Sequence, residues 1–397
     1  MRILYISQRV PFPPNRGDKI STWRHIDRLR QHHEVIALAF AHDDADRKAA
    51  EDLRAMGIET HTVDLNQRKA KLKSLPLLLT NKPLTLGVFG SRAMQALVDG
   101  LAPSADLLIG FSSSMGAFIL PHNDKPRIQF VVELDSDKWA QYAGFTKVPM
   151  KFIYAREART LLAFERKLCH AVDMSVLVTP LEERIFHERI PGAAAMTIRN
   201  GVDLEQFHPR NNVPEPAHFV FTGVMDYFPN VDGCVWFAKA ILPLIRKAFP
   251  EAHFTIVGNH PTPEIQALGT QPGIHVTGFV PETRDYLARA AVAVAPLRIA
   301  RGIQNKVLEA MSMGLAVVGT THATQGVDGR HNGEYLVADD AESFAEACIL
   351  LLNEPHRAKQ LGARARAFVE EHYQWERVLE PLDTVVADVV RNFRPTP

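Results

Sequence analysis

One stretch of the chain combines cationic, carboxylate and glycine residues at a spacing that suits a phosphorylated ligand. An apolar run is followed by Arg298, Arg301 and Gly302, and a helical pattern then carries Lys306 and Glu309. Lys306 and Glu309 share one helix face, because positions three or four apart are neighbours on a helix. Cations beside a helix N-terminus suit a diphosphate, and a carboxylate one turn further along suits sugar hydroxyls. The alternative interpretation is a solvated face with an incidental Lys306–Glu309 ion pair.

Two further groups of polar residues follow apolar runs in the first half of the chain. Gly17 and Asp18 end a proline-rich loop, where Gly17 permits a close backbone approach and Asp18 can cap the helix that follows. Asp135 lies among three carboxylates that follow another apolar run. Such a cluster is compatible with metal binding or acid/base chemistry, but its members can equally cap the next helix or pair with Lys138.

The elements that must position these residues are short apolar strands alternating with amphipathic helices. This alternation indicates a parallel sheet covered on both faces, and ligands of open α/β sheets bind beyond the carboxyl ends of the strands. The strands expected in the first half are Arg2–Ile6, Glu34–Phe40, Glu59–Leu65, Asp106–Gly110, Arg127–Leu134, Met174–Val178 and Met196–Arg199.

A polar, proline-rich linker at 211–216 separates this half from a second run of the same alternation. The fold class is therefore α/β, with two doubly wound Rossmann-like domains and a ligand site expected in the cleft between them. We predict an N-terminal domain over 1–210, a C-terminal domain over 211–373, and a closing helix and tail over 374–397. The second half is expected to contain the helix Val231–Phe249 and the strands His218–Thr222, His253–Val257, Ile274–Thr277, Val292–Ala295, Leu315–Val318 and Glu334–Val337.

Composition and charge exclude several classes of protein. The 397 residues carry 45 Lys and Arg and 45 Asp and Glu, and this balance argues against a surface devoted to nucleic acid. The three cysteines are far apart and form no CxxC pair, so neither a disulfide framework nor a zinc finger is expected, and a reducing cytoplasmic compartment fits best. Neither a signal peptide nor a membrane-spanning segment is predicted.

The segment 65–98 is unusual in its charge. It contains six Lys and Arg residues and no Asp or Glu, and a cluster of leucines lies beside the cations. Basic residues next to apolar ones can hold a protein on an anionic leaflet, so peripheral contact with the inner face of the cytoplasmic membrane is one expectation. The other interpretation is a solvated helix face followed by a turn that faces the core.

Several motifs, taken in their order along the chain, resemble those of the GT-B glycosyltransferases, specifically the retaining family 4 (glycosyl transferases group 1). The family's donor-site motif has Glu, seven residues and Glu-Ala-Met, and the stretch from Arg301 to Glu309-Ala310-Met311 is similar to it. Asn200-Gly201-Val202-Asp203 resembles the family's crossover into the second domain, and Tyr373-Gln374-Trp375 resembles the start of its closing helix, which packs back on the first domain. The subgroup it resembles is that of bacterial sugar transferases associated with exopolysaccharide loci.

The resemblance implies a nucleotide-sugar site. Glu309 takes the position of the carboxylate that binds the ribose, whereas Arg301 replaces the glutamate that contacts the donor hexose. The family's Arg and Lys after the first strand of the second domain are absent, so we expect Arg301 and Lys306, with Arg298, to contact the diphosphate. Asp135 is expected on the acceptor side. Further binding residues are expected at Gly302, Ile303, Gln304, Asn305, Gly223, Gly278 and Phe279, and at Gly17 and Asp18 in the first domain.

The implied reaction transfers a sugar from a nucleoside-diphosphate sugar to a glycan or lipid-linked acceptor with retained configuration, in the synthesis of exopolysaccharide or another cell-surface glycan. Cations and helix amides can stabilise the departing diphosphate, so we expect no metal ion and no other cofactor. Two alternatives remain open. One is a nucleotide-sugar epimerase of related fold, and the other is a catalytically silent nucleotide-binding partner, which the replacement of the first glutamate would explain.

Overall fold

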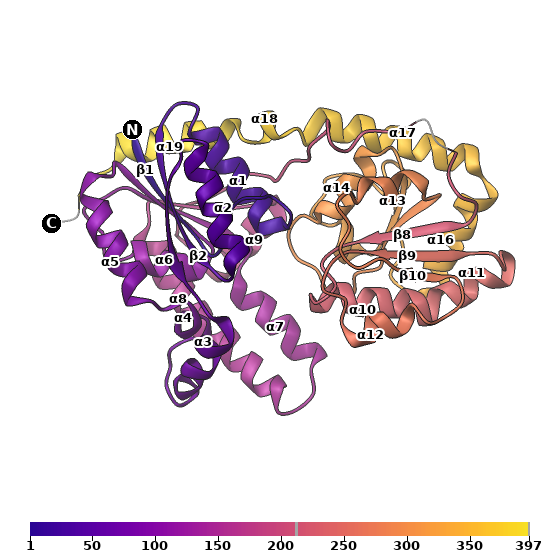
Figure 1. Cartoon of the computed structure of the whole chain (residues 1–397), viewed down its shortest axis with the longest axis horizontal. Coiled ribbons are helices and arrows are strands. Elements are labelled where there is room, and N and C mark those ends of the chain that lie inside the picture. Colours follow the sequence, from indigo (N-terminus) through magenta and orange to yellow (C-terminus); the bar gives the residue numbers. More distant parts are fainter. Residues whose placement is uncertain (211–212, 396–397) are drawn as a thin grey trace. The chain divides into compact units, whose positions relative to one another are not determined.

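The computed structural model describes residues 1–210 and 213–395, which form two units, each built around one sheet (Figure 1). Unit 1 comprises Met1–Ile198 and Leu379–Pro397, and unit 2 comprises Arg199–Val378. The predicted α/β class with two Rossmann-like domains is confirmed, and the first two residues of the predicted linker at 211–216 lie outside the described residues. Within the described ranges, no helix combines the length and the apolar character needed to cross a bilayer.

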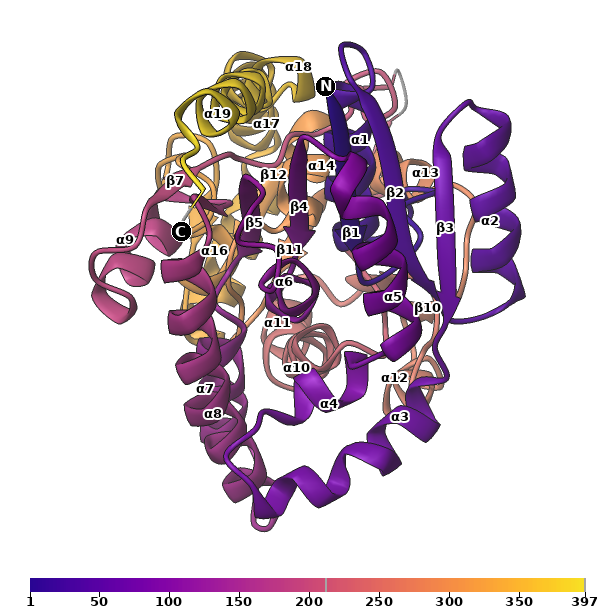
Figure 2. The same ribbon diagram turned by 90° about the vertical axis from the view of Figure 1, so that its left-hand side faces the viewer.

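Unit 1 contains a seven-stranded sheet in which all neighbouring strands are parallel (Figure 2). The order β3-β2-β1-β4-β5-β6-β7 reverses between β1 and β4, which makes this the topological switch point. Helices cover both faces, and this explains why the central strands are apolar throughout. The strands are β1 (Arg2–Ser7), β2 (Glu34–Ala41), β3 (Glu59–Asp64), β4 (Leu107–Phe111), β5 (Arg127–Val132), β6 (Met174–Leu177) and β7 (Ala195–Thr197).

The helices of unit 1 begin where the sequence supplies a cap or a break. Asp43 accepts a hydrogen bond from the Asp46 amide at the start of α2, and Thr179 accepts one from the Glu182 amide at the start of α9. The helices are α1 (Gly17–Leu29), α2 (Asp44–Ala55), α3 (Gln67–Ser74), α4 (Leu84–Phe89), α5 (Arg92–Leu101), α6 (Ser113–Ile119), α7 (Asp135–Phe145), α8 (Met150–Ala171), α9 (Pro180–Arg189) and α19 (Glu380–Asn392), with the 3₁₀ turns η1 (Leu75–Leu79) and η2 (Ala102–Ser104).

Unit 2 contains a six-stranded sheet, again with all neighbours parallel, in the order β10-β9-β8-β11-β12-β13. Its core is a single cluster of buried aliphatic and aromatic side chains from both faces of the sheet. The predicted strands of both units are all found, with their ends displaced by two residues at most. Those of unit 2 are β8 (His218–Thr222), β9 (His253–Val257), β10 (Ile274–Val276), β11 (Val292–Ala295), β12 (Ala316–Gly319) and β13 (Leu336–Val337).

The helical stretch predicted over 231–249 is confirmed between 228 and 248, but it is not one regular α-helix. The structure has two helices joined by the π-helical turn η3 (Phe237–Ile241), and Pro243 stands in the first turn of the second helix. Proline has no amide hydrogen, and its ring clashes with the carbonyl four residues earlier, so a regular α-helix cannot run through it. The helices of unit 2 are α10 (Phe228–Trp236), α11 (Leu242–Ala248), α12 (Pro263–Leu268), α13 (Arg284–Arg289), α14 (Asn305–Ser312), α15 (Thr321–Thr324), α16 (Ala341–Asn353), α17 (Pro355–His372) and α18 (Trp375–Val378).

The chain returns to unit 1 at its C-terminal end. The predicted closing helix is divided at Leu379 into α18, in unit 2, and α19, in unit 1. Arg28 on α1 donates to the Asp383 carboxylate on α19, at 2.9 Å from Nε and 2.5 Å from Nη2. Unit 2 begins at Arg199 rather than at the predicted 211, because the crossover residue Val202 donates its amide hydrogen to the Tyr373 carbonyl at 2.8 Å and so belongs to this unit.

Candidate functional site

The carboxyl ends of β8 and β11 lie side by side in unit 2. β8 ends at Thr222 and pairs in parallel with β11, which ends at Ala295. The loop that follows β9 lies directly against the loop after β8. A Cβ on Gly258 would stand 1.7 Å from the Gly223 carbonyl oxygen, and Gly258 has a φ of +151°. Only glycine permits this approach, so these loops are fixed at the edge where ligands of such sheets bind.

The N-terminus of α14 is positioned by a tight loop after β11. Gly302 has a φ of +61°, and a Cβ on Gly326 would come within 2.2 Å of the Gly302 carbonyl oxygen. Gln304, the residue before the helix, donates from Nε2 to the Arg301 carbonyl at 2.9 Å. No capping side chain accepts a hydrogen bond from the first-turn amides of α14.

Lys306 and Glu309 both lie on α14, three residues apart, and both are half-buried. The Lys306 ammonium lies 5.3 Å from the centroid of the Phe221 ring and 3.4 Å from the Gln304 side-chain oxygen. Burial lowers the pKa of Lys306 to about 8, opposed by the nearby Glu309 charge. Burial raises the pKa of Glu309 to about 7, opposed by Lys306. A pair of ionisable groups with displaced pKa values at a sheet edge is typical of a functional site.

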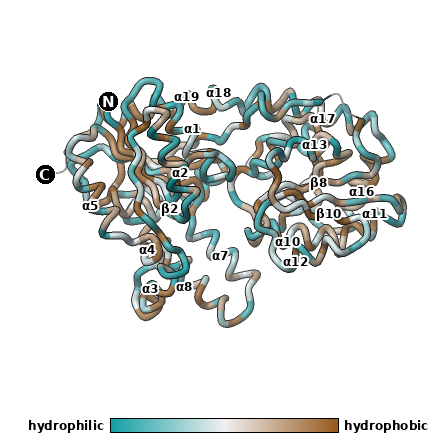
Figure 3. Tube along the Cα trace, viewed as in Figure 1, coloured by the Kyte–Doolittle hydropathy of each residue, from teal (hydrophilic) through white to brown (hydrophobic). Residues whose placement is uncertain are grey.

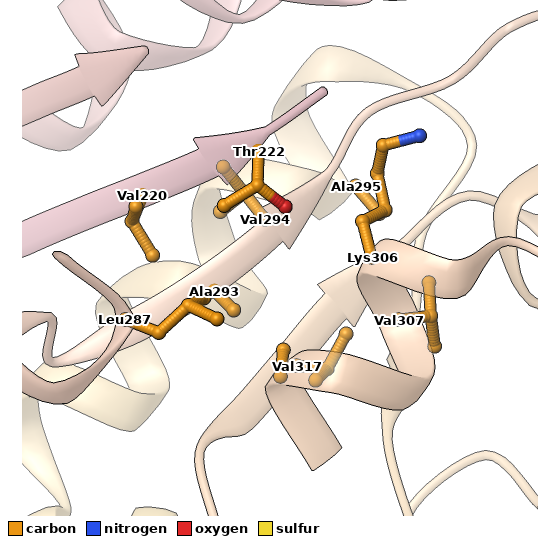
Figure 4. Close-up of a pocket in the computed structure, with 10 residues that line it drawn as sticks. Val220, Thr222, Leu287, Ala293, Val294, Ala295, Lys306, Val307 and Val317 are labelled. Carbon is orange, nitrogen blue, oxygen red and sulfur yellow. The ribbon is translucent and has the colours of Figure 1, made fainter. Parts of the chain in front are cut away.

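A small cavity lies beneath this edge, between the sheet and α14 (Figure 4). Its volume is about 10 Å³, which is about the space that one water molecule needs, so it cannot hold a nucleotide. Figure 4 shows the Lys306 amine directed away from the apolar residues that line the cavity. The lining residues are Val220, Thr222, Leu287, Ala293, Val294, Ala295, Lys306, Val307, Ala310 and Val317.

The two predicted arginines differ in their surroundings. Arg298 donates from Nε and Nη2 to the two carboxylate oxygens of Asp232, at 3.0 and 2.5 Å, and its guanidinium lies 5.7 Å from the Trp236 ring centroid. Both partners are on α10, so the guanidinium of Arg298 is already held by a carboxylate. Arg301 is half-buried in the loop before α14, directly beside Gly302. The diphosphate contacts expected of Arg298 and Arg301 both stay predictions.

The remaining predicted residues of unit 2 lie at the same edge of its sheet. Ile303 and Asn305 flank Gln304 and are half-buried. Gly278 and Phe279 follow β10, where Gly278 has a φ of +68° and the Phe279 side chain is 73% exposed. An exposed aromatic ring at a strand end can stack on a nucleotide base.

In unit 1, Gly17 and Asp18 lie at the start of α1, after β1. The expected capping role of Asp18 is wrong, because Arg16 is the cap position and Asp18 lies in the first turn. The Asp18 carboxylate instead faces two arginines, with Arg16 Nε at 2.6 Å and Arg9 Nε at 3.5 Å. Arg9 was missed by the sequence reasoning, although an arginine two residues beyond a buried strand is a detectable signal.

Asp135 begins α7, beyond the carboxyl end of β5. Lys138 donates to the Asp135 carboxylate at 2.6 Å and lies 3.8 Å from Glu133, which confirms that Lys138 pairs with this acidic cluster. A paired carboxylate remains able to accept a hydrogen bond from a substrate hydroxyl, so the acceptor-side role of Asp135 stays a prediction.

The most buried carboxyl group near Asp135 is Glu165, from the middle of α8. Its side chain is inaccessible to solvent and accepts hydrogen bonds from the hydroxyl groups of Ser113, at 2.9 Å, and Ser136. Burial, and secondarily the Asp135 charge, raise its pKa to about 8. Glu165 was not predicted from the sequence, although a glutamate on the buried face of an amphipathic helix can be recognised there.

The two strand ends beside Glu165 are strained. Ser112 follows β4 with a φ of +76°, and Val132 ends β5 with a φ of +68°. Positive φ is rare for residues other than glycine and is costly for a β-branched one such as Val132. Such strain concentrates at functional sites. The carboxyl ends of β4 and β5 are therefore the candidate acceptor region of unit 1.

A histidine cluster lies at the opposite end of the unit 2 sheet. His218 Nδ1 and His253 Nε2 are 3.1 and 3.4 Å from one Glu215 carboxylate oxygen, where β8 and β9 begin. The two imidazole rings are stacked, with their centroids 4.5 Å apart and an angle of 16° between their planes. A metal ion must lie in the plane of each ring that binds it, so these stacked rings are not arranged to bind one ion together. Arg289 also approaches the carboxylate, at 3.7 Å. The cluster is no part of the candidate donor site, and the expected metal-free reaction stays a prediction.

Part of the chain is similar in sequence to known proteins. Residues 216–354, which lie in unit 2, match the model of the family Glycosyl transferases group 1. An uncharacterized 44.6 kDa protein from the cps region of Klebsiella pneumoniae is 22% identical over 174 residues, which are 42% of this chain and 45% of that protein. The chain thus spans about half the length of the curated relatives it matches.

Solved structures resemble the whole chain. Sucrose-phosphate synthase from Thermosynechococcus elongatus aligns with a TM-score of 0.74 and 16% identity over 99% of this chain and 100% of that one. HepE from Anabaena, in complex with UDP-glucose, aligns with a TM-score of 0.71 and 13% identity over 98% of this chain and 100% of that one. At these identities the likeness shows the fold alone, which is that of the GT-B glycosyltransferases.

Proposed function

We propose that this chain is a retaining hexosyltransferase, which moves a sugar from a nucleoside-diphosphate donor to a glycan or lipid-linked acceptor in the synthesis of a cell-surface glycan. The observation that carries the proposal is the Lys306–Glu309 pair on α14, at the carboxyl ends of β8 and β11, within the region that matches the family Glycosyl transferases group 1. A cytoplasmic location, inferred from cysteine usage, is part of the same proposal.

Two of the comparisons support the finer parts of this proposal. HepE, with the same fold, binds UDP-glucose, which favours a nucleoside-diphosphate sugar as the donor. A relative encoded in a cps region favours a role in making an extracellular polysaccharide. A retaining mechanism and the hexose rest on the resemblance of the donor motif.

In the proposed reaction, α14 stabilises the leaving group. The Lys306 ammonium, the amides of the first turn and Arg301 contact the diphosphate and stabilise the negative charge that develops on it as the glycosidic bond breaks. Glu309, one turn further along, accepts the ribose hydroxyls. A bound diphosphate raises the pKa of Lys306 above about 8, because its negative charge favours the ammonium form. The acceptor hydroxyl is held in unit 1 near Asp135, with Gly17 and Asp18 at the neighbouring loop.

A nucleotide panel tests the proposal most directly. In thermal melting with UDP, GDP and ADP, one of the three should raise the melting temperature clearly more than the others, since a ligand at 100 times its Kd adds about 2.7 kcal/mol of stability. The matching nucleotide sugar should then be consumed faster when a lipid-linked acceptor is present. Epimerisation without an acceptor would favour the epimerase, and nucleotide binding without any turnover would favour the silent partner. No shift with any nucleotide would contradict the donor site itself.

The replacement of the family's first glutamate is tested by Arg301→Ala. We expect a higher donor KM or a lower kcat, because a diphosphate contact is lost. The stability of the variant without nucleotide should equal that of the wild type. Arg364→Ala, which removes a cation from α17 elsewhere in unit 2, serves as the matched control. Unchanged donor kinetics in Arg301→Ala would remove Arg301 from the mechanism.

A further inference from the structure

Exposed apolar side chains gather at two segments of unit 1. Of the thirteen large apolar residues that are exposed among the described residues, seven lie on the segment 72–79 or the segment 145–152. Within these two segments, four side chains are more than 60% exposed, namely Leu72, Leu79, Val148 and Phe152. The remaining three are Leu75, Phe145 and Met150.

These two segments belong to one surface. The first is the end of α3 with η1, and the second is the turn between α7 and α8. Arg156, near the start of α8, donates to the carbonyls of Leu77 and Lys82, at 2.6 and 3.1 Å. Glu157 accepts the amide hydrogens of Leu84 and Thr85 at the start of α4, at 2.7 and 2.8 Å. Figures 1 and 2 both place α3 and the α7–α8 turn at the same end of unit 1.

The charge of this surface has one sign. The segments 65–98 and 138–156 contain no Asp or Glu. Figure 3 shows hydrophilic and hydrophobic stretches alternating in both segments. The exposed lysines that flank the apolar side chains are Lys69, Lys71, Lys73, Lys82, Lys147 and Lys151.

We propose that this surface, formed by residues 69–82 and 145–152, docks unit 1 on the headgroup region of an anionic phospholipid bilayer. Exposed leucine and phenylalanine side chains would enter the boundary between headgroups and acyl chains, and the lysines would contact the lipid phosphates. A solvated face does not explain a Leu79 that is 94% exposed or a Phe152 that is 68% exposed. The continuous absence of carboxylates favours an anionic lipid surface over a protein partner of mixed charge. The inference goes beyond the transferase activity and does not require it.

The docking is tested by sedimentation of the full chain with vesicles. Binding should be strong to vesicles that contain phosphatidylglycerol, weak to pure phosphatidylcholine, and weaker at high salt, because the lysine contribution is screened. Lys73→Gln, Lys147→Gln and Lys151→Gln should each weaken binding about fivefold. Leu79→Ser with Phe152→Ser should weaken it about tenfold or more, because two apolar insertions are lost.

Matched controls lie outside the surface. Val213→Ser, which removes an apolar side chain that is 91% exposed, and Lys359→Gln, which removes an exposed lysine in unit 2, should leave vesicle binding unchanged. Amide exchange should slow at 69–82 and 145–152 when vesicles are added. All variants change exposed residues, so unaltered melting curves are expected.

Three results would overturn the proposal. The first is equal binding to neutral and anionic vesicles, and the second is amide protection confined to other parts of the chain. The third is self-association that the Leu79→Ser and Phe152→Ser variants abolish in the absence of any vesicle binding, since the surface would then be an interface between copies of this chain. Each readout is made without a sugar donor, so it is independent of whether the transferase proposal holds.

Discussion

Burial moves the pKa values of Lys306 and Glu309 toward each other, to about 8 and about 7. Both groups carry their charges between these two values. Below pH 7 the Glu309 carboxylate takes up a proton and loses acceptor capacity, and above pH 8 the Lys306 ammonium loses its proton and its attraction for phosphate. If the proposed donor site is correct, the same helix would therefore supply an anion for ribose and a cation for diphosphate only in a narrow range of pH.

The affinity for a nucleoside diphosphate should therefore be greatest between about pH 7 and pH 8 and decline on both sides. Glu309→Gln should remove the decline on the acidic side and weaken binding about 10- to 150-fold, since a hydrogen bond to a charged group contributes about 1.5–3 kcal/mol. Isothermal titration across this pH range measures both effects. Glu346→Gln on the exposed face of α16 is the control, and a Glu309→Gln chain that binds like the wild type would exclude Glu309 from the site.

Glu165 makes the stability of unit 1 dependent on pH in a defined direction. Its pKa is raised from 4.5 to about 8, so the folded chain holds a proton that the unfolded chain releases between these values. Stability should fall as pH rises through this window, at up to about 1.4 kcal/mol per pH unit from this group.

Glu165→Gln should flatten that dependence, because the amide stays neutral and can exchange hydrogen bonds with Ser113 and Ser136. Melting temperatures between pH 5 and pH 8 compare the variant with wild type, and the exposed Glu51→Gln on α2 is the control. If the wild type and Glu165→Gln curves run parallel, Glu165 is not protonated in the folded state.

At the scale of elements, the loops at the carboxyl edge of the unit 2 sheet depend on glycines. Gly258 lies against the Gly223 carbonyl with a φ that other residues rarely adopt, and Gly326 lies against Gly302 in the loop before α14. These contacts join backbone to backbone, so neither partner can move without displacing the loop that it touches. The loops that would surround a nucleotide are therefore held in place before any ligand arrives.

Gly258→Ala should destabilise the protein by about 2 kcal/mol or more, because a Cβ would overlap the Gly223 carbonyl oxygen and the φ of +151° is strained for alanine. Gly100→Ala is the matched control. It lies in α5 with no atom within 4 Å of the added Cβ, and alanine should stabilise that helix by about 0.5–1 kcal/mol. Urea unfolding of both variants measures the difference, and equal effects would contradict the argument.

At the scale of the whole molecule, the last segment of the chain belongs to the first unit. The buried face of α19 consists of Leu382, Val385, Val386 and Val389, and Asp383 on the same helix pairs with Arg28. The chain therefore crosses between the units twice, once near residue 199 and again at 379.

Truncation after Val378 should destabilise unit 1 severely. Four buried aliphatic side chains, each contributing about 1.5–3 kcal/mol, equal or exceed half the stability of a typical domain. Thermal melting should show an early transition, while nucleotide binding assigned to unit 2 should persist at low temperature. Truncation after Asn392 keeps α19 and is the control. A single unchanged melting transition in the shorter truncation product would show that α19 contributes little to unit 1.

The class of fold and the positions of the strands could be predicted without the structure, because buried strands of a parallel sheet are continuous apolar runs that can be recognised locally. The sequence also placed Lys306 and Glu309 on one helix face, since helical spacing is local. The π-helical turn before Pro243 was not predicted, although the proline is visible in the sequence, because the apolar periodicity is continuous on both sides of it.

Contacts between residues far apart in the sequence could not be predicted and are known only from the folded chain. Arg298 meets Asp232 across 66 positions, and Glu165 meets Ser113 across 52, so neither pairing leaves a local pattern. The joining of segments 69–82 and 145–152 into one basic and apolar surface has the same origin, since Arg156 reaches η1 across 79 positions. Apolar periodicity depends on neighbours along the chain, whereas the pairing and the pKa of a side chain depend on which neighbours folding brings into contact with it.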